Sequence, residues 1–349
     1  MALASLHMLS FSLRNPYSFS LDRDGPFPAL FRLLIVRSPS IHTLDLSEFA
    51  DHTILITGAT SGCGFECARA LGRVGCNLIL TSRNQQRGED AKQQIQQEAK
   101  DAGVETNISV LELDMTSFQS VKSFPSRLDK AATHLDVAIL NAGVYQTEFN
   151  LCSETGWEET VQVNVLATSA LTLLLRPYLS RADSGRLLFV SSEAHAWADP
   201  HPYPTRQLLQ ELNTPDVYPC YQRYHISKLL LVLWASQIAH REEWSKISVA
   251  SVSPGFSRTS LFRDFNGYTV AKVLENIVCR SSEQGSSQYM YALQNMAKSQ
   301  GNGRFWSDGA WRSPSTAVSC KSGQEIQSTL YTDVVGILRE AGVIDSTTE

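Results

Sequence analysis

One stretch sets the architecture of the chain, Thr53-Ile-Leu-Ile-Thr57-Gly58-Ala-Thr-Ser-Gly62-Cys-Gly64. Its first five residues are apolar or β-branched, which predicts a short buried strand. Residues 65–74 are rich in Ala and Leu and predict a helix that ends at Gly75. A strand, a glycine turn and a helix in this order indicate a diphosphate site, because glycines admit close backbone approach and the helix N-terminus is partly positive. The alternative is an ordinary tight turn of an α/β protein.

A second motif, Tyr224-His-Ile-Ser-Lys228, places a phenol and an ammonium four residues apart. On a helix the two side chains lie one turn apart on the same face. A free tyrosine has a pKa of about 10, and a lysine within reach is expected to lower that pKa by stabilising the phenolate. Such a pair passes a proton to or from a carbonyl or alcohol oxygen, although the spacing alone also arises by chance.

The rest of the chain alternates between strand and helix patterns from Asp51 onward. This alternation predicts a single Rossmann-type, doubly wound parallel sheet with helices on both faces. Ligands of such sheets bind at the carboxyl ends of the strands, where the glycine turn stands. The predicted strands cover residues 52–57, 77–81, 108–113, 137–140, 186–190, 247–252 and 303–306. The predicted helices include residues 85–102, 117–131, 157–179 and 221–240, and apolar spacing from Ile326 to Leu338 indicates a final helix.

Further short motifs follow in order along the chain, each at the end of a predicted strand or on the next helix. They are Asp114 in Leu-Asp-Met, Asn141-Ala-Gly143, Asn164 in Val-Asn-Val, Ser191-Ser192, Pro254-Gly255 and Thr259. Together with the glycine turn and the Tyr-Lys pair, they make residues 46–344 resemble the short-chain dehydrogenase/reductase family. Within it the chain is most similar to the retinol-dehydrogenase-like branch, which includes many fungal enzymes. Cys63 and Leu140 depart conservatively from the family pattern.

The resemblance implies hydride transfer between a nicotinamide and a carbonyl or alcohol carbon. It implies that Tyr224 is the general acid in reduction and the base in oxidation, that Lys228 also holds the nicotinamide ribose, that Ser192 binds the substrate oxygen and that Asn164 holds a water linked to Lys228. The residues that the resemblance assigns to cofactor binding are Gly58, Ser61, Gly62, Gly64, Arg83, Asp114, Asn141, Tyr224, Lys228 and Thr259.

The cofactor is predicted from the end of the second strand, Leu80-Thr81-Ser82-Arg83. An acidic residue there would bind the ribose 2′-hydroxyl of NAD, and none is present. Arg83 offers a planar cation that suits a 2′-phosphate, and Ser61 adds a hydroxyl. We therefore expect NADP (NADPH), against the alternative that Arg83 is a solvated charge at a strand end.

Net charge and cysteine content limit the classes of partner and compartment that suit this chain. A net charge of −5 among 349 residues gives no basic footprint, so nucleic-acid binding is disfavoured. Seven cysteines without a Cys-x-x-Cys pair disfavour a metal site or a disulfide framework and favour a reducing, cytoplasmic compartment. The expected partner is a small hydrophobic substrate, with a homodimer as a further expectation from the resemblance.

The chain divides into an extension at residues 1–45, expected to be poorly ordered, and a catalytic domain at residues 46–349. Pro16, Pro26 and Pro28 break any long helix in the extension. No apolar run reaches the length of about 20 residues that spans a bilayer. Peripheral membrane contact through residues 27–36 is the less favoured alternative.

The substrate is the open question. The interval from Ser192 to Tyr224 holds five prolines and predicts a loop with a short helix at residues 206–212. Its aromatic residues Trp197, Tyr203 and Tyr218 either line a pocket or anchor the loop. Aromatic and apolar residues at 256–268 suggest a hydrophobic ketone, aldehyde or alcohol, and the fungal resemblance suggests secondary metabolism. The rival functions are a catalytically inactive nucleotide-binding regulator and a non-redox epimerase or dehydratase on the same fold.

Overall fold

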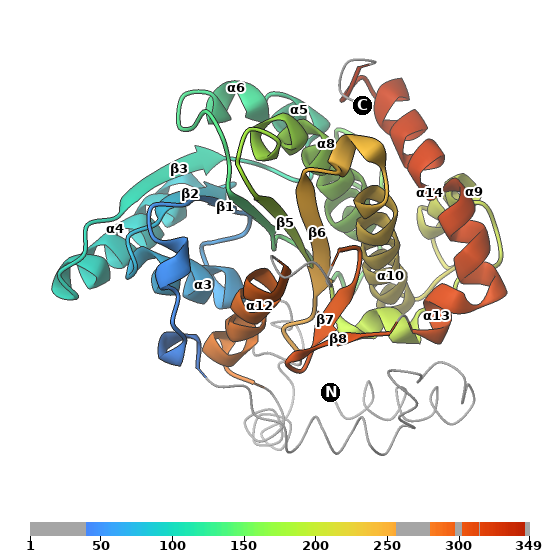
Figure 1. Ribbon diagram of the computed structural model, residues 1–349. Helices are drawn as coiled ribbons and strands as arrows, with labels where there is room; N and C mark the ends of the chain where they lie inside the picture. The colour runs from blue at the N-terminus through green and yellow to red at the C-terminus, as the bar shows by residue number, and fades with distance from the viewer. Residues whose placement is uncertain (1–39, 256–279, 297–301, 314, 346–349) are drawn as a thin grey trace, which may run out of the picture.

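The computed structural model describes residues 40–255, 280–296, 302–313 and 315–345 of the chain. An eight-stranded sheet runs through its centre in the order β3-β2-β1-β4-β5-β6-β7-β8, with helices packed on both faces (Figure 1). Seven strands are parallel, as predicted, and the order of the first six is that of a dinucleotide-binding sheet. The expectation of a Rossmann-type doubly wound fold is therefore confirmed.

The strands lie close to their predicted positions, with one addition. The eighth strand follows a turn at Asp308 and Gly309 and pairs antiparallel with the seventh, which sequence patterning missed because each is only three residues long. The strands are β1 Thr53–Ile56, β2 Asn77–Ser82, β3 Asn107–Glu112, β4 Val137–Leu140, β5 Gly185–Val190, β6 Ile247–Val252, β7 Phe305–Ser307 and β8 Ala310–Arg312.

The helices alternate with the strands. The α-helices are α3 Gly62–Gly72, α4 Gln85–Asp101, α5 Phe118–Lys122, α6 Phe124–Leu128, α7 Glu159–Val161, α8 Thr168–Leu179, α9 Thr205–Leu212, α10 Cys220–Ala239, α12 Ser282–Met296, α13 Thr316–Ser319 and α14 Lys321–Glu340. Short 3-10 turns are η1 Ile41–Thr43, η2 Ser47–Phe49, η4 Glu193–Trp197 and η5 Glu242–Trp244, and η3 Gln162–Ala167 is a π-helical segment.

Two helical predictions need correction. The helix expected at residues 117–131 is two short helices, because Pro125 lies in the first turn of α6 and supplies no backbone N–H to continue α5. The helix α12 was not predicted at all. The first half of its buried face is built from Gly, Ser and Gln at residues 285–288, and the apolar stripe at residues 289, 292, 293 and 296 covers only its last two turns.

The two faces of the sheet carry separate cores. In β1, Leu55 points into the core formed with α8, α10 and α14, whereas Ile54 and Ile56 point into the core formed with α3 and α12. This alternation follows from the two-residue period of a strand. Burial on both faces explains why the strands of this sheet are almost continuously apolar.

The described chain is already packed at its beginning, since Ile41 is fully buried in the core beside α3 and α12. The division at residue 46 stays a prediction, and the proposed membrane contact at residues 27–36 lies outside the described residues. Within the described ranges, no helix combines the length and the apolar character needed to cross a bilayer.

Candidate active site

A cavity opens at the carboxyl ends of the parallel strands. Eight of the residues proposed from the sequence line it, although they come from segments as far apart as β1 and α10. They are Gly58, Ser61, Gly62, Arg83, Asp114, Asn141, Tyr224 and Lys228. Two others, Gly64 and Ser192, contact this set without lining the cavity, and Asn164 lies near it through Gly143. Thr259 and the predicted lid at residues 256–268 lie outside the described residues.

The glycine turn has the conformation that a diphosphate site needs. Gly58 and Gly62 have φ angles of +65° and +59°, which other residues adopt only at a cost. A Cβ on Gly64 would lie 2.4 Å from Asn141 Nδ2, so only glycine fits there. Ser61 is the N-cap residue of α3, but its side chain does not cap the helix. The first N–H groups of α3 therefore face the cavity beside the turn, an arrangement that fits an anionic diphosphate.

Asn141 holds this turn in place. Its Nδ2 donates hydrogen bonds to the backbone oxygens of Thr57 and Gly58, at 2.8 and 3.1 Å. The neighbouring Ala142 N–H donates to Thr57 Oγ1 at 2.9 Å. The prediction gave Asn141 a direct cofactor contact, which stays a prediction. In the structure its side-chain amide ties the end of β4 to the turn.

The far end of the cavity is cationic. Arg83 follows β2, and Arg87 lies one turn later in α4, so two guanidinium groups face the same end. Sequence reasoning missed Arg87, because Arg83 precedes the N-cap of α4 and helical spacing does not relate the two residues. Asp114 lines the cavity after β3, and its Oδ1 accepts hydrogen bonds from the Thr116 backbone and hydroxyl, at 2.9 and 2.7 Å. Its geometry is that of a residue fixed at a strand end.

Tyr224 and Lys228 lie one turn apart in the first half of α10, as the spacing predicted. Both are buried, and Lys228 Nζ is 5.6 Å from the centre of the Tyr224 ring. The ammonium donates a hydrogen bond to the Val190 backbone oxygen at 3.1 Å. The end of β5 thus holds the lysine beside the tyrosine.

The pKa of the Tyr224 phenol differs from the prediction. We expected Lys228 to lower it, but burial raises this pKa well above its ordinary value, and a hydrogen bond with Ser192 only partly opposes the rise. Burial also lowers the pKa of Lys228, to about 8. Desolvation disfavours the charged form of each group, and this effect outweighs their mutual attraction. At neutral pH the phenol keeps its proton and the lysine is mostly charged.

The two serines after β5 have different partners. Ser191 donates its hydroxyl hydrogen to the Lys228 backbone oxygen at 2.9 Å and so packs β5 against α10. Ser192 begins η4, accepts a hydrogen bond from Ala194 N–H at 3.1 Å and also bonds to the Tyr224 phenol. Ser191 lines the cavity, whereas Ser192 contacts the phenol, and the choice of Ser192 as the residue beside the reacting oxygen stays a prediction.

Asn164 lies behind the pair, in the π-helical segment η3. Its Oδ1 accepts a hydrogen bond from Val144 N–H at 2.8 Å, and its Nδ2 donates to the Val144 backbone oxygen and to Ser227 Oγ, at 2.9 and 3.0 Å. A Cβ on Gly143 would be 3.2 Å from both Asn164 Oδ1 and Lys228 Nζ. A π segment is often found at a functional site, and this one carries Asn164, whose amide joins the Val144 backbone to Ser227 of α10.

Sequence reasoning missed Tyr145, which contacts Tyr224. The two rings meet edge to face with centroids 5.2 Å apart, and they cluster with Trp197 and two alanines of η4. The only sequence signal for Tyr145 was its position two residues after Asn141-Ala-Gly143. Aromatic packing of this kind gives the reacting end of the site an apolar wall.

The loop before α10 is anchored rather than open. Gln222 donates to the Trp197 backbone oxygen at 3.2 Å, and Tyr218 accepts a hydrogen bond from His201 N–H at 2.9 Å. Trp197, Tyr203 and Tyr218 do not line the cavity described above. Of the two interpretations left open, these contacts favour anchoring, while Trp197 also stands behind Tyr224.

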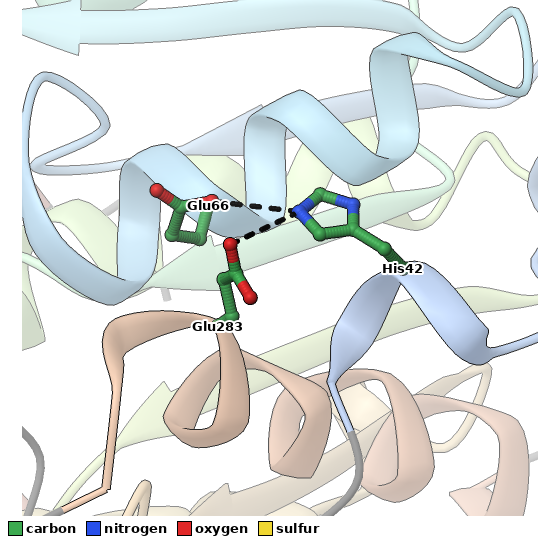
Figure 2. Close-up of side chains that lie close together, drawn as sticks. All are labelled: His42, Glu66 and Glu283. Carbon is green, nitrogen blue, oxygen red and sulfur yellow. Dashed lines mark ion pairs between the residues drawn. The ribbon is translucent and has the colours of Figure 1, made fainter.

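A separate polar cluster joins η1 to α3 and α12. Figure 2 shows His42 pointing toward Glu66 and Glu283, with Nε2 3.7 Å from each nearest carboxylate oxygen. Their potential ligand atoms lie within 4.8 Å of one another. However, Arg73 approaches His42 Nδ1 at 3.3 Å and can only donate, which leaves the Nε2 hydrogen facing the carboxylates. Arg69 also donates to Glu66 at 2.7 Å. The chemistry is that of an ion-pair network, not a metal site.

Comparisons with known proteins agree with this geometry. The family model for the short chain dehydrogenase matches residues 52–203. The short-chain dehydrogenase/reductase phmF of Phaeosphaeria nodorum is 32% identical, covering 84% of this chain and 88% of that protein. The short-chain dehydrogenase fogG of Aspergillus ruber is 30% identical, covering 95% of this chain and 99% of its own.

Solved structures share the fold at lower identity. An uncharacterised protein from Mycobacterium paratuberculosis superposes with a TM-score of 0.64 at 24% identity, covering 86% of this chain and 98% of its own. A putative short chain dehydrogenase from Escherichia coli CFT073, solved in complex with NADPH, gives a TM-score of 0.55 at 21% identity. The match covers 76% of this chain and 100% of that one. With the fungal relatives, these findings make the chain a member of the short-chain dehydrogenase/reductase family of oxidoreductases.

Proposed function

We propose that this protein is an NADPH-dependent reductase of a hydrophobic ketone or aldehyde. The observation that carries the proposal is the buried Tyr224 phenol beside Ser192 and Lys228, in the same cavity as the glycine turn. The proposal extends to a tailoring step in secondary metabolism, on the ground of the fungal relatives alone.

The chain supplies the proton and the orientation. When bound, the nicotinamide supplies the hydride that adds to the carbonyl carbon of the substrate. Ser192 hydrogen-bonds the carbonyl oxygen, and the Tyr224 O–H bond breaks as its proton passes to that oxygen, giving the alcohol. The positive charge of Lys228 stabilises the phenolate that remains until it is reprotonated. Asn164 fixes the backbone around Val144 and Ser227 beside the lysine.

The raised pKa of Tyr224 favours reduction over oxidation. A general acid must hold its proton before the reaction, and burial keeps this phenol protonated across the neutral range. Oxidation would require the phenolate at the start, which is the disfavoured form in this environment. The protonation state therefore supports carbonyl reduction as the direction of catalysis.

The choice of NADPH rests on Arg83 and Arg87. Both line the cavity after β2, where an NAD-specific site would carry an acidic residue. Guanidinium groups suit a 2′-phosphate by charge and by hydrogen-bonding geometry. We expect Arg83→Ala to weaken NADPH binding about 10- to 100-fold and NADH binding by less than about threefold. Equal losses for both cofactors, measured by fluorescence titration, would contradict the assignment.

The substrate class follows from the wall around the reacting end. The ring of Tyr224 lines the cavity, and Tyr145 and Trp197 pack around it, so the proton donor lies in aromatic surroundings. Apolar and aromatic ligands bury this surface favourably, whereas a charged substrate would lose its hydration without a partner. A hydrophobic carbonyl compound therefore fits the site best.

The decisive experiment measures NADPH oxidation against a panel of hydrophobic ketones and aldehydes. Tyr224→Phe should lower kcat about 10²- to 10⁴-fold, because it removes the proton donor and little else. Tyr221→Phe is the matched control, since it changes an exposed tyrosine of the same helix and should keep full activity. Unchanged turnover in Tyr224→Phe would exclude the mechanism. Absence of turnover with every carbonyl, despite NADPH binding, would favour a regulatory or non-redox role.

A further inference from the structure

Asn141 works as a clamp only in one orientation. Its Nδ2 faces two backbone oxygens, those of Thr57 and Gly58. A flipped side chain would place its carbonyl oxygen against both of these acceptors, and the turn would lose both hydrogen bonds. Gly64 packs so closely on the same amide that the turn cannot relax around a displaced group. A hydrogen-bond donor to Asn141 Oδ1 would therefore fix the orientation of the amide and, through it, the turn.

Tyr289 of α12 is that partner. Its hydroxyl donates a hydrogen bond to Asn141 Oδ1 at 3.0 Å. The side chain is 1% exposed, and the residue reaches the wall of the cavity from the opposite side of the turn. Since α12 packs directly on α3, β5 and β6, its position is set by the core rather than by solvent. The helix lies across the lower end of α3 in Figure 1.

The Tyr289 phenol is well suited to donate a hydrogen bond to Asn141 Oδ1. Burial raises the pKa of Tyr289 well above its ordinary value, so the hydroxyl remains a hydrogen-bond donor at any physiological pH. Asn141 Oδ1 then has a donor and Nδ2 has two acceptors, so every hydrogen-bonding group of the amide on this side is satisfied. A side chain without the hydroxyl would leave Oδ1 buried without this donor.

We propose that Tyr289 is a positioning residue for the nicotinamide cofactor: it orients the Asn141 amide, which holds the glycine turn in the shape that receives the diphosphate. The proposal rests on the proposed cofactor binding but names a residue outside the proton-transfer set. Tyr289 acts through Asn141 and need not touch the reacting atoms.

Tyr289→Phe removes only the hydroxyl and tests the proposal. We expect the Kd and KM for NADPH to rise about 5- to 20-fold, since one buried hydrogen bond is lost and the amide is released. The value of kcat at saturating NADPH should stay within about twofold, because Tyr224 and Lys228 are untouched. Tyr178→Phe is the control, as it removes another phenol of a buried residue, which donates to Asp129 Oδ1 at 2.6 Å near the amino end of β4. It should lower thermal stability without changing NADPH affinity.

A second variant tests whether the Tyr289 hydroxyl acts through Asn141 or through another neighbour, such as the Cys63 thiol. In an Asn141→Ala background, which itself should bind NADPH weakly, Tyr289→Phe should add less than about a twofold change. A full additional loss there would show that Tyr289 acts through another group and would overturn the proposal. So would an unchanged NADPH Kd in the single Tyr289→Phe variant.

Direct titration with NADPH needs no carbonyl substrate, so the two proposals fail in different ways. If the wild-type protein binds NADPH and Tyr289→Phe binds it equally well, only the positioning role is wrong. If the wild-type protein binds neither NADPH nor NADH, the proposed function fails and the positioning role fails with it. Loss of kcat without loss of affinity would also contradict the positioning role.

Discussion

At the scale of single residues, burial governs the chemistry of the site. Among the described residues, no carboxylate pairs with Lys228 to offset its desolvation, and the pKa of its ammonium falls to about 8. The neighbouring Tyr224 responds to the same burial in the opposite sense, because its charged form is the deprotonated one. The shift of Tyr224 keeps the phenol neutral, whereas the shift of Lys228 works against its charge and leaves the lysine mostly positive only below a pH of about 8.

This reasoning predicts the pH dependence of carbonyl reduction. The positive charge of Lys228 is present below its pKa and is lost as pH rises through about 8. We therefore expect kcat/KM to be level in the neutral range, to halve near pH 8 and then to fall about tenfold per pH unit. Tyr224 contributes no break in this range because its pKa is raised above its ordinary value.

The variant Lys228→Arg checks the assignment of that break. Arginine stays charged throughout, so the residual activity should show no inflection near pH 8, even though the longer side chain costs overall rate. The measurement is a pH–rate profile of NADPH oxidation for both proteins. A wild-type rate that increases between pH 8 and 9 would assign the break to another group.

At the scale of elements, the glycine turn and α3 form a unit whose shape requires glycine, because a Cβ at Gly64 would clash with its neighbours. Gly64→Ala places a Cβ 2.4 Å from Asn141 Nδ2 and 2.7 Å from the Gly58 backbone oxygen. The turn must shift, at a cost of about 1–3 kcal/mol in the free energy of unfolding. NADPH affinity should fall at least about tenfold, because the shifted backbone no longer matches the diphosphate.

Gly103→Ala is the comparison for that experiment. Gly103 has a φ of +76°, and its Cβ would meet no atom within 4 Å. Alanine there costs about 1–2 kcal/mol of backbone strain and disturbs no neighbour. Urea unfolding should show both variants destabilised, while titration shows NADPH affinity reduced only in Gly64→Ala. A similar loss of affinity in both would mean that general destabilisation, not the turn, controls binding.

At the scale of the whole molecule, α14 packs against α10 (Figure 1). Tyr331 of α14 stacks on Trp234 of α10, with ring centroids 5.5 Å apart and planes 12° apart. Leu338 of α14 is fully buried in the same core. The C-terminal helix thus completes the core that supports the catalytic helix without contributing a residue to the cavity wall.

Leu338→Ala should therefore lower the free energy of unfolding by about 2–5 kcal/mol, since it leaves a cavity in a closed core. At temperatures well below the midpoint of thermal unfolding, NADPH affinity and kcat should match those of the wild type. Calorimetry and titration on the same preparation check both parts. A loss of kcat in the folded protein would show that α14 also controls the position of Tyr224.

Features that depend only on neighbours along the chain could be predicted from local sequence. The strand at Thr53–Ile56 follows from its β-branched run, and the turn after it follows from Gly58, Gly62 and Gly64. The spacing of Tyr224 and Lys228 needs only the helical repeat to bring the two side chains together. Local geometry decides these features, so they could be predicted with their residues.

Only the tertiary structure decided the features that depend on contacts between distant segments and on exclusion of water. The hydroxyl of Tyr289 meets Asn141 across 148 positions of sequence. The pKa of Tyr224 rises because many segments together bury it, which reverses the prediction made from the neighbouring lysine alone. Desolvation and long-range hydrogen bonds are properties of the packed molecule, and no local pattern encodes them.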